Sequence, residues 1–339
     1  MYVIGVDGGS TKTVAMVADD QGHILGAARG MGSNWSGEDV RIPMTLVAET
    51  ARQALQQAGL NGEDISAGVF SLAGADWPED HTRREAVLSQ AKLTRKVIVK
   101  NDTFGGLRAG ISCPHGMVIA AGTGVNAAVI TPDGREYAYG YYAYSGGAGA
   151  IAGDAFDALL RAEDGRGQPT VLTSRVLSWL GFPNVESMLR AMILQKIDNG
   201  RFNSICPLVF EAAVQQDEVA KAILVHQGHS LAEYATAMVR RFDLHALEFE
   251  LVLAGSVFKG VSPLLADTIG EDVHRAAPFA RLVRPRFEPA VGSVLLAYDA
   301  FSIPQTAAID AGLAATTPPP TFFDTIDGQG YQTASGEKA

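Results

Sequence analysis

Cysteine and long apolar runs are what this sequence most lacks. Only Cys113 and Cys206 occur among 339 residues, which excludes a disulfide framework and a cysteine-rich metal or iron–sulfur site within one chain. No apolar run approaches the roughly 20 residues that a membrane-spanning helix needs. The first residues lack a basic stretch followed by an apolar one, so we expect no secretory signal. These absences favour a protein of the reducing cytoplasm with no membrane partner.

Basic residues are also in the minority. The chain has 27 Lys and Arg against 37 Asp and Glu, a formal net charge of −10, and the basic residues form no long run. An acidic surface argues against nucleic acid and against a membrane surface as partner. The 47% of hydrophobic residues is typical of a globular protein and excludes a mainly disordered chain. At about 100–200 residues per domain, the length predicts two domains.

Glycine, in contrast, is abundant and clustered: the 37 glycines are about 11% of the chain, against a usual value of about 7%. Between the clusters, hydrophobic patterning predicts a repeated order of elements. The first half is expected to contain strands over 2–6, 13–17, 24–28, 68–72 and 97–99, with helices over 46–58 and 79–92. The second half is expected to contain strands over 117–121, 126–131, 136–142, 249–253 and 282–283, with helices within 147–240 and a closing helix over 291–301.

Each half therefore begins with three hairpin-linked strands and continues as alternating helices and strands, which predicts two α/β domains with a cleft between them. Ligands of open α/β sheets bind beyond the carboxyl ends of the strands, where the Gly-rich turns fall. We expect a first domain over 1–113 and a second over 114–303 that carries a helical insertion. Residues 304–339, with three consecutive prolines and a polar end, are expected to be a flexible tail.

The first Gly-rich turn, in residues 5–13, has the composition of a phosphate-binding loop. Its glycines allow positive φ angles and close approach of a ligand, and its hydroxyls, lysine and backbone N–H groups can bind phosphate oxygens. The candidate phosphate ligands are Gly8, Gly9, Ser10, Thr11, Lys12 and Thr13. Asp7 could hold Mg²⁺ through water. The turn is not a Walker A loop, because Thr11 precedes the lysine and a strand follows; a plain hairpin with a solvated Lys12 is the alternative.

A second turn holds the same place in the second half. Its candidate phosphate ligands are Gly122, Thr123, Gly124 and Asn126. Two such turns at matching positions could grip the phosphates of one nucleotide. Residues 122–127 and 147–152 match the pattern G-x-G-x-x-A, but a strand follows the first and no ribose-binding acid follows the second. A nicotinamide-dependent enzyme is therefore disfavoured.

Asp102 follows the strand over 97–99 and precedes a Gly-containing helix. An aspartate placed there could accept the proton of a hydroxyl that attacks a phosphoryl group. The alternative is that Asp102 or Thr103 only caps the helix, but the two phosphate turns favour catalysis. After the third strand, Asn34 can bond sugar hydroxyls and Trp35 can pack on a sugar face; an Asx turn is the alternative there.

Two further segments of the second half are candidates. Gly255 and Ser256 end the strand over 249–253, where glycine would let an adenine or ribose lie against backbone and Lys259 could cover it. Ser256 could equally cap the following helix. Asp154 is a candidate acceptor for a sugar hydroxyl or a helix cap.

These motifs, in this order, resemble the sugar-kinase branch of the actin-like ATPase superfamily, and most closely the N-acetylglucosamine kinase family grouped with the BadF/BadG-type ATPases. The resemblance covers roughly residues 3–303 and implies two actin-like (ribonuclease H-like) domains with a central nucleotide and sugar cleft. It identifies residues 5–13 and 122–126 with the phosphate loops and Asn101-Asp102 with the catalytic-base position. It also identifies 253–256 with the adenosine motif, and 32–35 and 71–76, including Gly74 and Asp76, with sugar-side loops.

The resemblance implies ATP-dependent phosphorylation of N-acetylglucosamine or glucosamine at the 6-hydroxyl, with Asp102 as base and Mg²⁺ held near Asp7. A small-molecule sugar is the implied partner, and a homodimer is compatible with it. The chain departs from the family at residues 146–149, at 153–156 and at Val125, where an aromatic sugar contact, an acid and a serine are usual. Two other classes stay open: an ATPase activator of a dehydratase, against which the two isolated cysteines count, and a non-catalytic sugar or nucleotide sensor.

Overall fold

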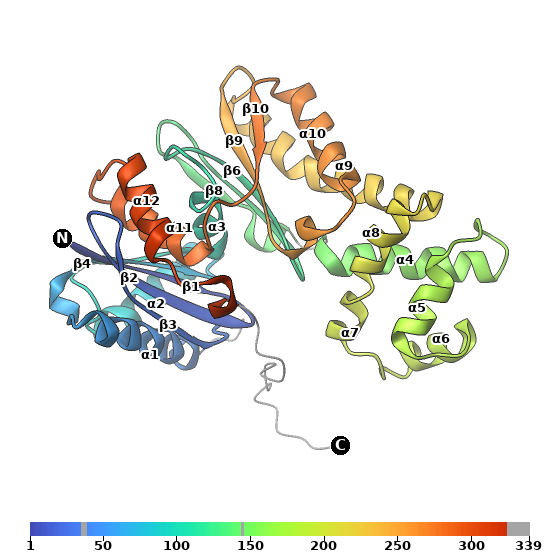
Figure 1. Ribbon diagram of the computed structural model, residues 1–339, viewed down its shortest axis with the longest axis horizontal. Coiled ribbons are helices and arrows are strands. Elements are labelled where there is room, and N and C mark those ends of the chain that lie inside the picture. Colours follow the sequence, from blue (N-terminus) through green and yellow to red (C-terminus); the bar gives the residue numbers. More distant parts are fainter. Residues whose placement is uncertain (35–38, 144–145, 324–339) are drawn as a thin grey trace. The chain divides into compact units, whose positions relative to one another are not determined.

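The computed structural model describes residues 1–34, 39–143 and 146–323, which form two compact units (Figure 1). The first joins Met1–Gly116, Ala128–Gly140 and the chain from Arg284 onward, and the second joins Met117–Ala127 and Tyr141–Val283. The first unit is therefore built from segments at both ends of the chain. This division differs from the expected boundary at 113/114, because the closing part of the chain returns to the first unit.

The sheet of the first unit has the strand order β3-β2-β1-β4-β5. Its strands are β1 (Tyr2–Gly8), β2 (Lys12–Asp19), β3 (Ile24–Met31), β4 (Ile65–Leu72) and β5 (Val97–Asn101). β1, β2 and β3 are joined as antiparallel hairpins, whereas β1, β4 and β5 run parallel. The strands agree with those predicted, because alternating or continuous β-branched residues bounded by Gly and Asp turns are a local signal.

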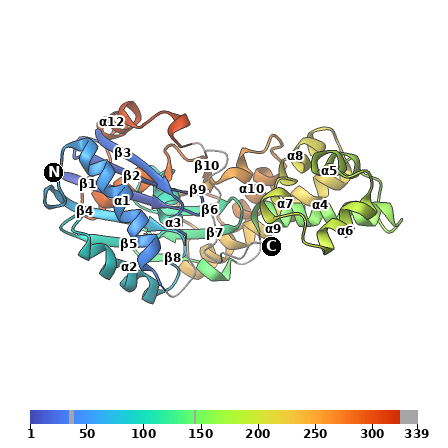
Figure 2. The same ribbon diagram turned by 90° about the horizontal axis from the view of Figure 1, so that it is seen from below.

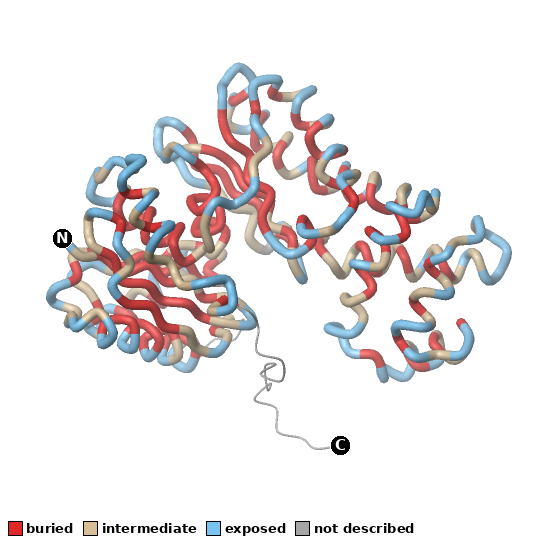
Figure 3. The backbone as a smooth tube through the Cα atoms, viewed as in Figure 1, coloured by how far each residue is buried: buried red, intermediate tan, exposed pale blue. Residues whose placement is uncertain are grey.

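Helices cover this sheet on its two faces (Figures 1 and 2). α1 (Arg41–Ala58) and α2 (Pro78–Gln90) lie on one face, and α1 ends at Gly59 in the left-handed conformation, as predicted. α3 (Asp102–Arg108) and α11 (Pro289–Asp299) lie on the other. Strand residues alternate between the two: Ile4 and Val6 are buried with α1, while the backbone of Gly5 lies against α11. The central strands are buried nearly throughout (Figure 3).

The second sheet repeats the order of the first. Its strands are β6 (Gly116–Ala121), β7 (Val125–Ile130), β8 (Glu136–Ala138), β9 (Phe249–Ala254) and β10 (Ala280–Val283), in the order β10-β9-β6-β7-β8. Read from β8, this is the arrangement of the first sheet, so the predicted fold class of two actin-like α/β domains is confirmed. β8 is shorter than expected, because a 3-10 turn over Gly140–Tyr142 follows it.

Between β8 and β9 the chain makes the predicted helical insertion. Its helices are α4 (Gly147–Glu163), α5 (Leu172–Leu180), α6 (Val185–Ile193), α7 (Asn199–Asn203), α8 (Cys206–Val214) and α9 (Glu218–Phe242). α9 packs on α10 (Leu264–Ala276), and α4 and α8 pack on α9 (Figure 2). Among the residues that the structure describes, none of the helices is both long and apolar enough to cross a membrane.

The closing segment differs from the sequence expectation. The helix expected at 291–301 is present as α11, but it packs on β1 and α3 of the first unit, not on the second sheet. The expected flexible tail instead continues into α12 (Ala307–Thr316), which packs along the edge strand β3, and into a 3-10 turn over Pro320–Phe322. The Thr316 hydroxyl accepts a hydrogen bond from the Ile24 N–H at 2.8 Å. The α12 helix therefore covers a sheet edge that would otherwise be open.

The contact of α11 with α3 gives a stability test. A Cβ added at Gly292 would lie 1.9 Å from the Gly105 carbonyl oxygen, whereas one added at Gly106 would meet nothing within 4 Å. We expect Gly292→Ala to destabilise the protein by about 1–3 kcal/mol through overpacking. Gly106→Ala should be neutral or stabilising by up to about 1 kcal/mol, since alanine favours a helix. Urea unfolding of both variants measures this; equal stabilities would contradict the described packing.

Candidate functional site

The candidate site in the first unit lies at the carboxyl ends of β1, β4 and β5. In the sheet register, Gly8 pairs with Leu72 and Leu72 pairs with Asn101, so the three parallel strands end side by side. The Ala73 N–H donates to the Gly8 carbonyl at 2.8 Å and continues the pairing beyond the strands. Asp7, the 73–76 turn and Asp102 are thereby placed together at the carboxyl ends of the parallel strands, which is where α/β folds bind ligands.

The first Gly-rich turn is packed against the segment that follows β3. The Gly9 carbonyl accepts hydrogen bonds from the N–H groups of Ser33 and Asn34, at 2.9 and 3.2 Å. The Asn34 side-chain amide donates to the Ser10 hydroxyl at 2.9 Å. Ser10 and Thr11 are exposed at the tip of the turn. The structure thus brings the predicted sugar residue Asn34 beside a predicted phosphate residue; Trp35, the other sugar residue predicted there, lies outside the described residues.

Two details of this turn differ from expectation. Gly8 and Gly9 do not have positive φ angles. Glycine is needed at position 8 for space, because an added Cβ would lie 2.7 Å from both Leu72 Cδ2 and Ser33 Oγ. Thr13 is fully buried, and its hydroxyl donates to the Met31 carbonyl at 2.8 Å. Thr13 therefore holds the turn against β3. The prediction that its hydroxyl binds a phosphate is wrong, because that hydroxyl is buried.

Asp102, Asn101 and Asp76 form a connected polar group. The buried Asn101 caps α3, accepting the Thr103 N–H at 3.0 Å, and its amide donates to Asp76 Oδ1 at 2.7 Å. The capping role that the sequence left open for Asp102 or Thr103 thus belongs to Asn101. From the sequence, Asn101 is expected only as part of the Asn101-Asp102 base position, although an asparagine before a helix is also a strong N-cap signal. His81 Nε2 lies 2.9 Å from the Ala75 carbonyl and restrains the 73–76 turn, in which Gly74 has a φ of 73°.

The environment of Asp102 shifts its pKa toward neutral pH. Burial and the negative charge of Asp76 raise the pKa of Asp102 from 3.8 to about 6, although hydrogen bonds from Thr103 and from its own backbone lower it. Burial and the charge of Asp80 also raise the pKa of Asp76, and the positive charges of Arg84 and His81 offset only part of this rise. A base whose pKa lies just below neutrality is ionised at pH 7 and still takes up a proton readily.

Asp7 is more strongly perturbed. Burial and the charges of Asp102 and Glu288 together raise its pKa to about 7, although the Lys12 ammonium lowers it. Glu288, which precedes α11, reaches this site because the closing segment returns to the first unit, whereas the expected boundaries place residue 288 in the second domain. No hydrogen-bond donor of the described residues reaches the Asp7 carboxylate. A crowded, poorly compensated carboxylate of this kind fits a divalent cation, and hard cations prefer carboxylate oxygens.

No cluster of three or more His, Cys, Asp or Glu able to cage a metal occurs in the described part of the chain. Mg²⁺ commonly uses one or two carboxylates, water and phosphate oxygens, so Asp7 could serve as its protein ligand without such a cluster. Both cysteines are free, and Cys206 is buried.

In the second unit, the second Gly-rich turn joins the start of α4. The Gly122 N–H donates to the Gly124 carbonyl, and the Gly122 carbonyl accepts from the Ala148 N–H, both at 2.8 Å. Gly147 has a φ of 71°, and an added Cβ would lie 2.5 Å from the Gly124 oxygen, so glycine is required there. Thr123 and Gly124 are exposed, while Asn126 accepts the Ala127 N–H at 2.8 Å.

The predicted adenosine segment lies next to this turn, because β6 and β9 are parallel neighbours. Gly255 has a φ of 100°, and an added Cβ would lie 2.3 Å from the Ala121 oxygen. Gly255 occupies the N-cap position of a 3-10 helix over Ser256–Lys259, so Ser256 is not the cap, and its hydroxyl is exposed, as is Lys259. The structure therefore brings the second phosphate turn and the adenosine segment together.

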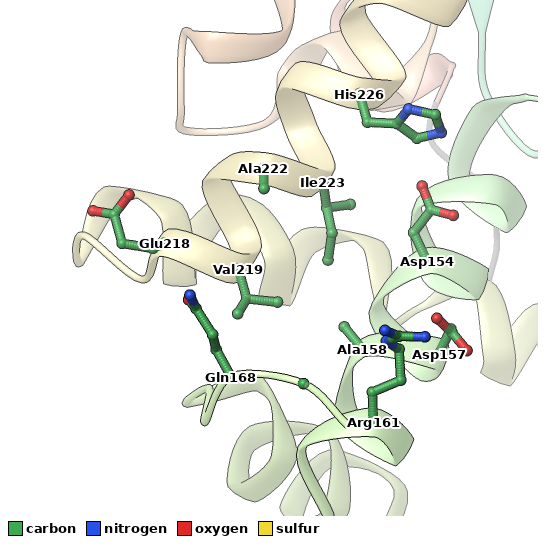
Figure 4. Close-up of a pocket in the computed structure, with 11 residues that line it drawn as sticks. Asp154, Asp157, Ala158, Arg161, Gln168, Glu218, Val219, Ala222, Ile223 and His226 are labelled. Carbon is green, nitrogen blue, oxygen red and sulfur yellow. The ribbon is translucent and has the colours of Figure 1, made fainter. Parts of the chain in front are cut away.

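Asp154 is placed apart from the second Gly-rich turn. It lies seven residues along α4 from Gly147, which is about 10 Å of helix. Its carboxylate accepts a hydrogen bond from the buried Gln227 at 2.6 Å. Asp154 lines a pocket of about 480 Å³ between α4 and α9 (Figure 4). Asp157, Arg161 and His226 line the same pocket, so its wall carries charges of both signs.

Comparison with solved structures defines the class of fold. A candidate N-acetylglucosamine kinase from Chromobacterium violaceum is 26% identical, with a TM-score of 0.65, and the match covers 87% of this chain and 98% of that one. A ROK hexokinase from Thermus thermophilus is 20% identical, with a TM-score of 0.54 and coverage of 89% and 99%. The fold is that of the two-domain sugar kinases.

Sequence comparison gives the family. The model of the BadF/BadG/BcrA/BcrD ATPase family matches residues 4–297, and the chain belongs to this family, as its motifs predicted. An N-acetylmuramic acid/N-acetylglucosamine kinase from Clostridium acetobutylicum is 27% identical over 87% of this chain and 98% of its own length. A glucosamine kinase from Vibrio cholerae is 23% identical over 87% and 95%.

The raised pKa of Asp7 predicts that this residue lowers the free energy of unfolding, by an amount that depends on pH. Its folded pKa of about 7 exceeds the ordinary 3.8, so the folded state loses stability as the pH rises from about 4 to 7, and the loss is complete above pH 7. Asp7→Asn should therefore raise the free energy of unfolding at pH 8 by roughly 2–4 kcal/mol. That gain should shrink as the pH falls from 7 toward 4, where both states become protonated.

Urea unfolding at pH 8, 6 and 4, without nucleotide or divalent cation, measures this gain. Asp133→Asn is the control, because Asp133 is exposed and its pKa is lowered by Thr131 and Arg135. A gain for Asp7→Asn that is the same at all three pH values would contradict the assigned environment.

Proposed function

We propose that this protein transfers the γ-phosphoryl group of ATP to the 6-hydroxyl of an amino sugar, N-acetylglucosamine or glucosamine, with Asp102 as general base. Two kinds of support lead to this proposal. The family is one of ATPases, and relatives matching nearly their full length are named as kinases of N-acetylglucosamine, N-acetylmuramic acid and glucosamine. The observation that carries the base assignment is the half-buried Asp102 carboxylate at the end of β5, with its pKa near 6.

In the proposed step, Asp102 accepts the proton of the sugar hydroxyl as its oxygen forms a bond to the γ-phosphorus. The bond between that phosphorus and the bridging oxygen of the β-phosphate breaks, and ADP leaves with the electron pair. Phosphoryl transfer requires mainly positioning and charge stabilisation, so one aligned carboxylate is sufficient as a base. Asn101 fixes the start of α3 and so positions Asp102, while its amide holds Asp76 nearby.

The phosphate groups are proposed to bind the backbone N–H groups and exposed hydroxyls of the two Gly-rich turns. In the first unit these are the residues from Gly8 to Thr11 together with Lys12. In the second unit they are Gly122, Thr123, Gly124 and Asn126. The exposed Gly255, Ser256 and Lys259 are proposed to receive the adenosine. Asp7 would hold Mg²⁺, which offsets the negative charge that develops on the phosphates when it is bound.

The sugar is proposed to bind Asn34, Gly74 and Asp76, with Trp35 as an aromatic contact. Asn34 and Asp76 offer both hydrogen-bond donors and acceptors, which is the chemistry that sugar hydroxyls require. The Asp154 carboxylate is also proposed to accept a hydrogen bond from a sugar hydroxyl. Its bond to Gln227 orients one carboxylate oxygen and leaves acceptor capacity on the other.

Asp102→Asn tests the base directly. We expect kcat for sugar phosphorylation to fall by about 10²- to 10⁴-fold, since asparagine cannot accept the proton. The dissociation constant for the sugar should change little, because the amide keeps the size and polarity of the carboxylate. Coupled ADP release and calorimetric sugar binding measure the two quantities. Turnover within a few-fold of the wild type would exclude this role for Asp102.

The pKa of Asp102 also predicts a pH profile. The base must be deprotonated, so kcat/KM should rise as the pH increases through about 6 to 7 and then level.

A panel of hexoses and hexosamines with ATP and Mg²⁺ separates the competing functions. Turnover that depends on an amino sugar supports the kinase. Sugar-independent ATP hydrolysis would instead indicate the ATPase, and binding without turnover the sensor.

A further inference from the structure

Lys12 contacts the closing segment of the chain. Its ammonium group donates a hydrogen bond to the carbonyl of Phe323 and lies 5.7 Å from the centroid of the Phe323 ring. Phe323 is only 6% exposed, although it lies more than 300 residues along the chain from Lys12. The cation of the first phosphate turn is therefore held by a backbone oxygen and an aromatic face. An ammonium group over an aromatic ring keeps its charge while it loses part of its water.

The closing segment that reaches Lys12 is itself firmly attached. α12 packs along β3, and Thr316 at its end accepts the Ile24 N–H. Three consecutive prolines follow, whose fixed φ angles restrict the path of the chain. The Phe322 carbonyl then accepts a hydrogen bond from Arg29 at 3.4 Å, and the Phe322 and Phe323 rings meet edge to face, with centroids 5.2 Å apart. Phe323 is thus delivered to Lys12 by a constrained segment.

We propose that Phe323 is a positioning residue for the nucleotide phosphates, acting through Lys12. A lysine has a long flexible side chain, and fixing it costs conformational entropy when it binds a phosphate. Phe323 reduces the entropy that Lys12 loses on binding phosphate, because its carbonyl accepts a hydrogen bond from the ammonium group and its ring restricts the direction of the side chain. This proposal rests on the proposed function, since it assigns Lys12 to the phosphates of ATP.

The test compares three substitutions. Phe323→Leu keeps an apolar side chain in the buried position but removes the aromatic face, whereas Phe323→Tyr keeps that face. Phe322→Leu is the matched control, because it makes the same side-chain change at the neighbouring residue and leaves the Phe323 ring over Lys12 in place. With saturating sugar, Phe323→Leu should raise the KM for ATP about 3- to 10-fold and leave kcat within about 2-fold. Phe323→Tyr and Phe322→Leu should stay within about 2-fold of the wild type.

A double-mutant cycle separates positioning from general loosening of the structure. In a Lys12→Met background there is no ammonium to hold, so Phe323→Leu should change the KM for ATP by less than about 2-fold. If the effect of Phe323→Leu is as large without Lys12 as with it, Phe323 does not act through Lys12, and the proposal is overturned.

The contact can also be judged without any assay of turnover. In nucleotide-free protein, the rate at which a water-soluble acylating reagent modifies Lys12 is followed by peptide mass spectrometry. Phe323→Leu should increase that rate several-fold, and Phe322→Leu should not. Equal rates in the wild type and Phe323→Leu overturn the proposal even in an active kinase. If the wild type phosphorylates no sugar, the proposed function fails, and the dissociation constant for ATP then replaces KM with the same criteria.

Discussion

The crowding of carboxylates at the carboxyl ends of β1, β4 and β5 is the constraint on which the first unit depends. Asp7, Asp76 and Asp102 come from three different strand ends, and the parallel register brings those ends together. Burial raises the pKa values of all three, and a neighbouring carboxylate adds to each rise: Asp102 for Asp7, Asp80 for Asp76 and Asp76 for Asp102. A stable fold would avoid such an arrangement unless it served a purpose, and a cationic ligand or a proton-transfer step supplies one.

The surrounding residues manage this repulsion with neutral and cationic groups. Asn101 binds one Asp76 oxygen and caps α3, which leaves the carboxylate of Asp102 out of the capping role. Lys12 lowers the pKa of Asp7, and Phe323 in turn holds Lys12. Electrostatic interactions therefore connect the carboxyl ends of β1, β4 and β5 with the first Gly-rich turn and the closing segment, although their residues come from distant parts of the chain.

The sequence predicted the local structure well. The strands of the two sheets, the end of α1 at Gly59 and the repeated order of elements all follow from turn residues and hydrophobic period, which act over a few residues. The match to the BadF/BadG-type ATPases confirms the family that the motifs indicated. What the sequence did not predict depends on long-range packing. Gly8 is required by Leu72 and Ser33 and not by its φ angle, and Thr13 is buried against β3. The Asn101–Asp76 bond and the approach of Phe323 to Lys12 likewise join residues that no local pattern connects.

The return of α11 and α12 to the first unit has a consequence for biosynthesis. The backbone of Gly5 lies against α11, and the edge strand β3 packs with α12, so residues that follow β10 complete the cover of the first sheet. A ribosome therefore releases the amino-terminal sheet long before the helices that shield it have been made. During that interval the nascent chain exposes an apolar sheet face and an open edge, which are the features that recruit chaperones and promote misassembly. The amino-terminal unit is therefore complete only after α11 and α12 have been synthesised.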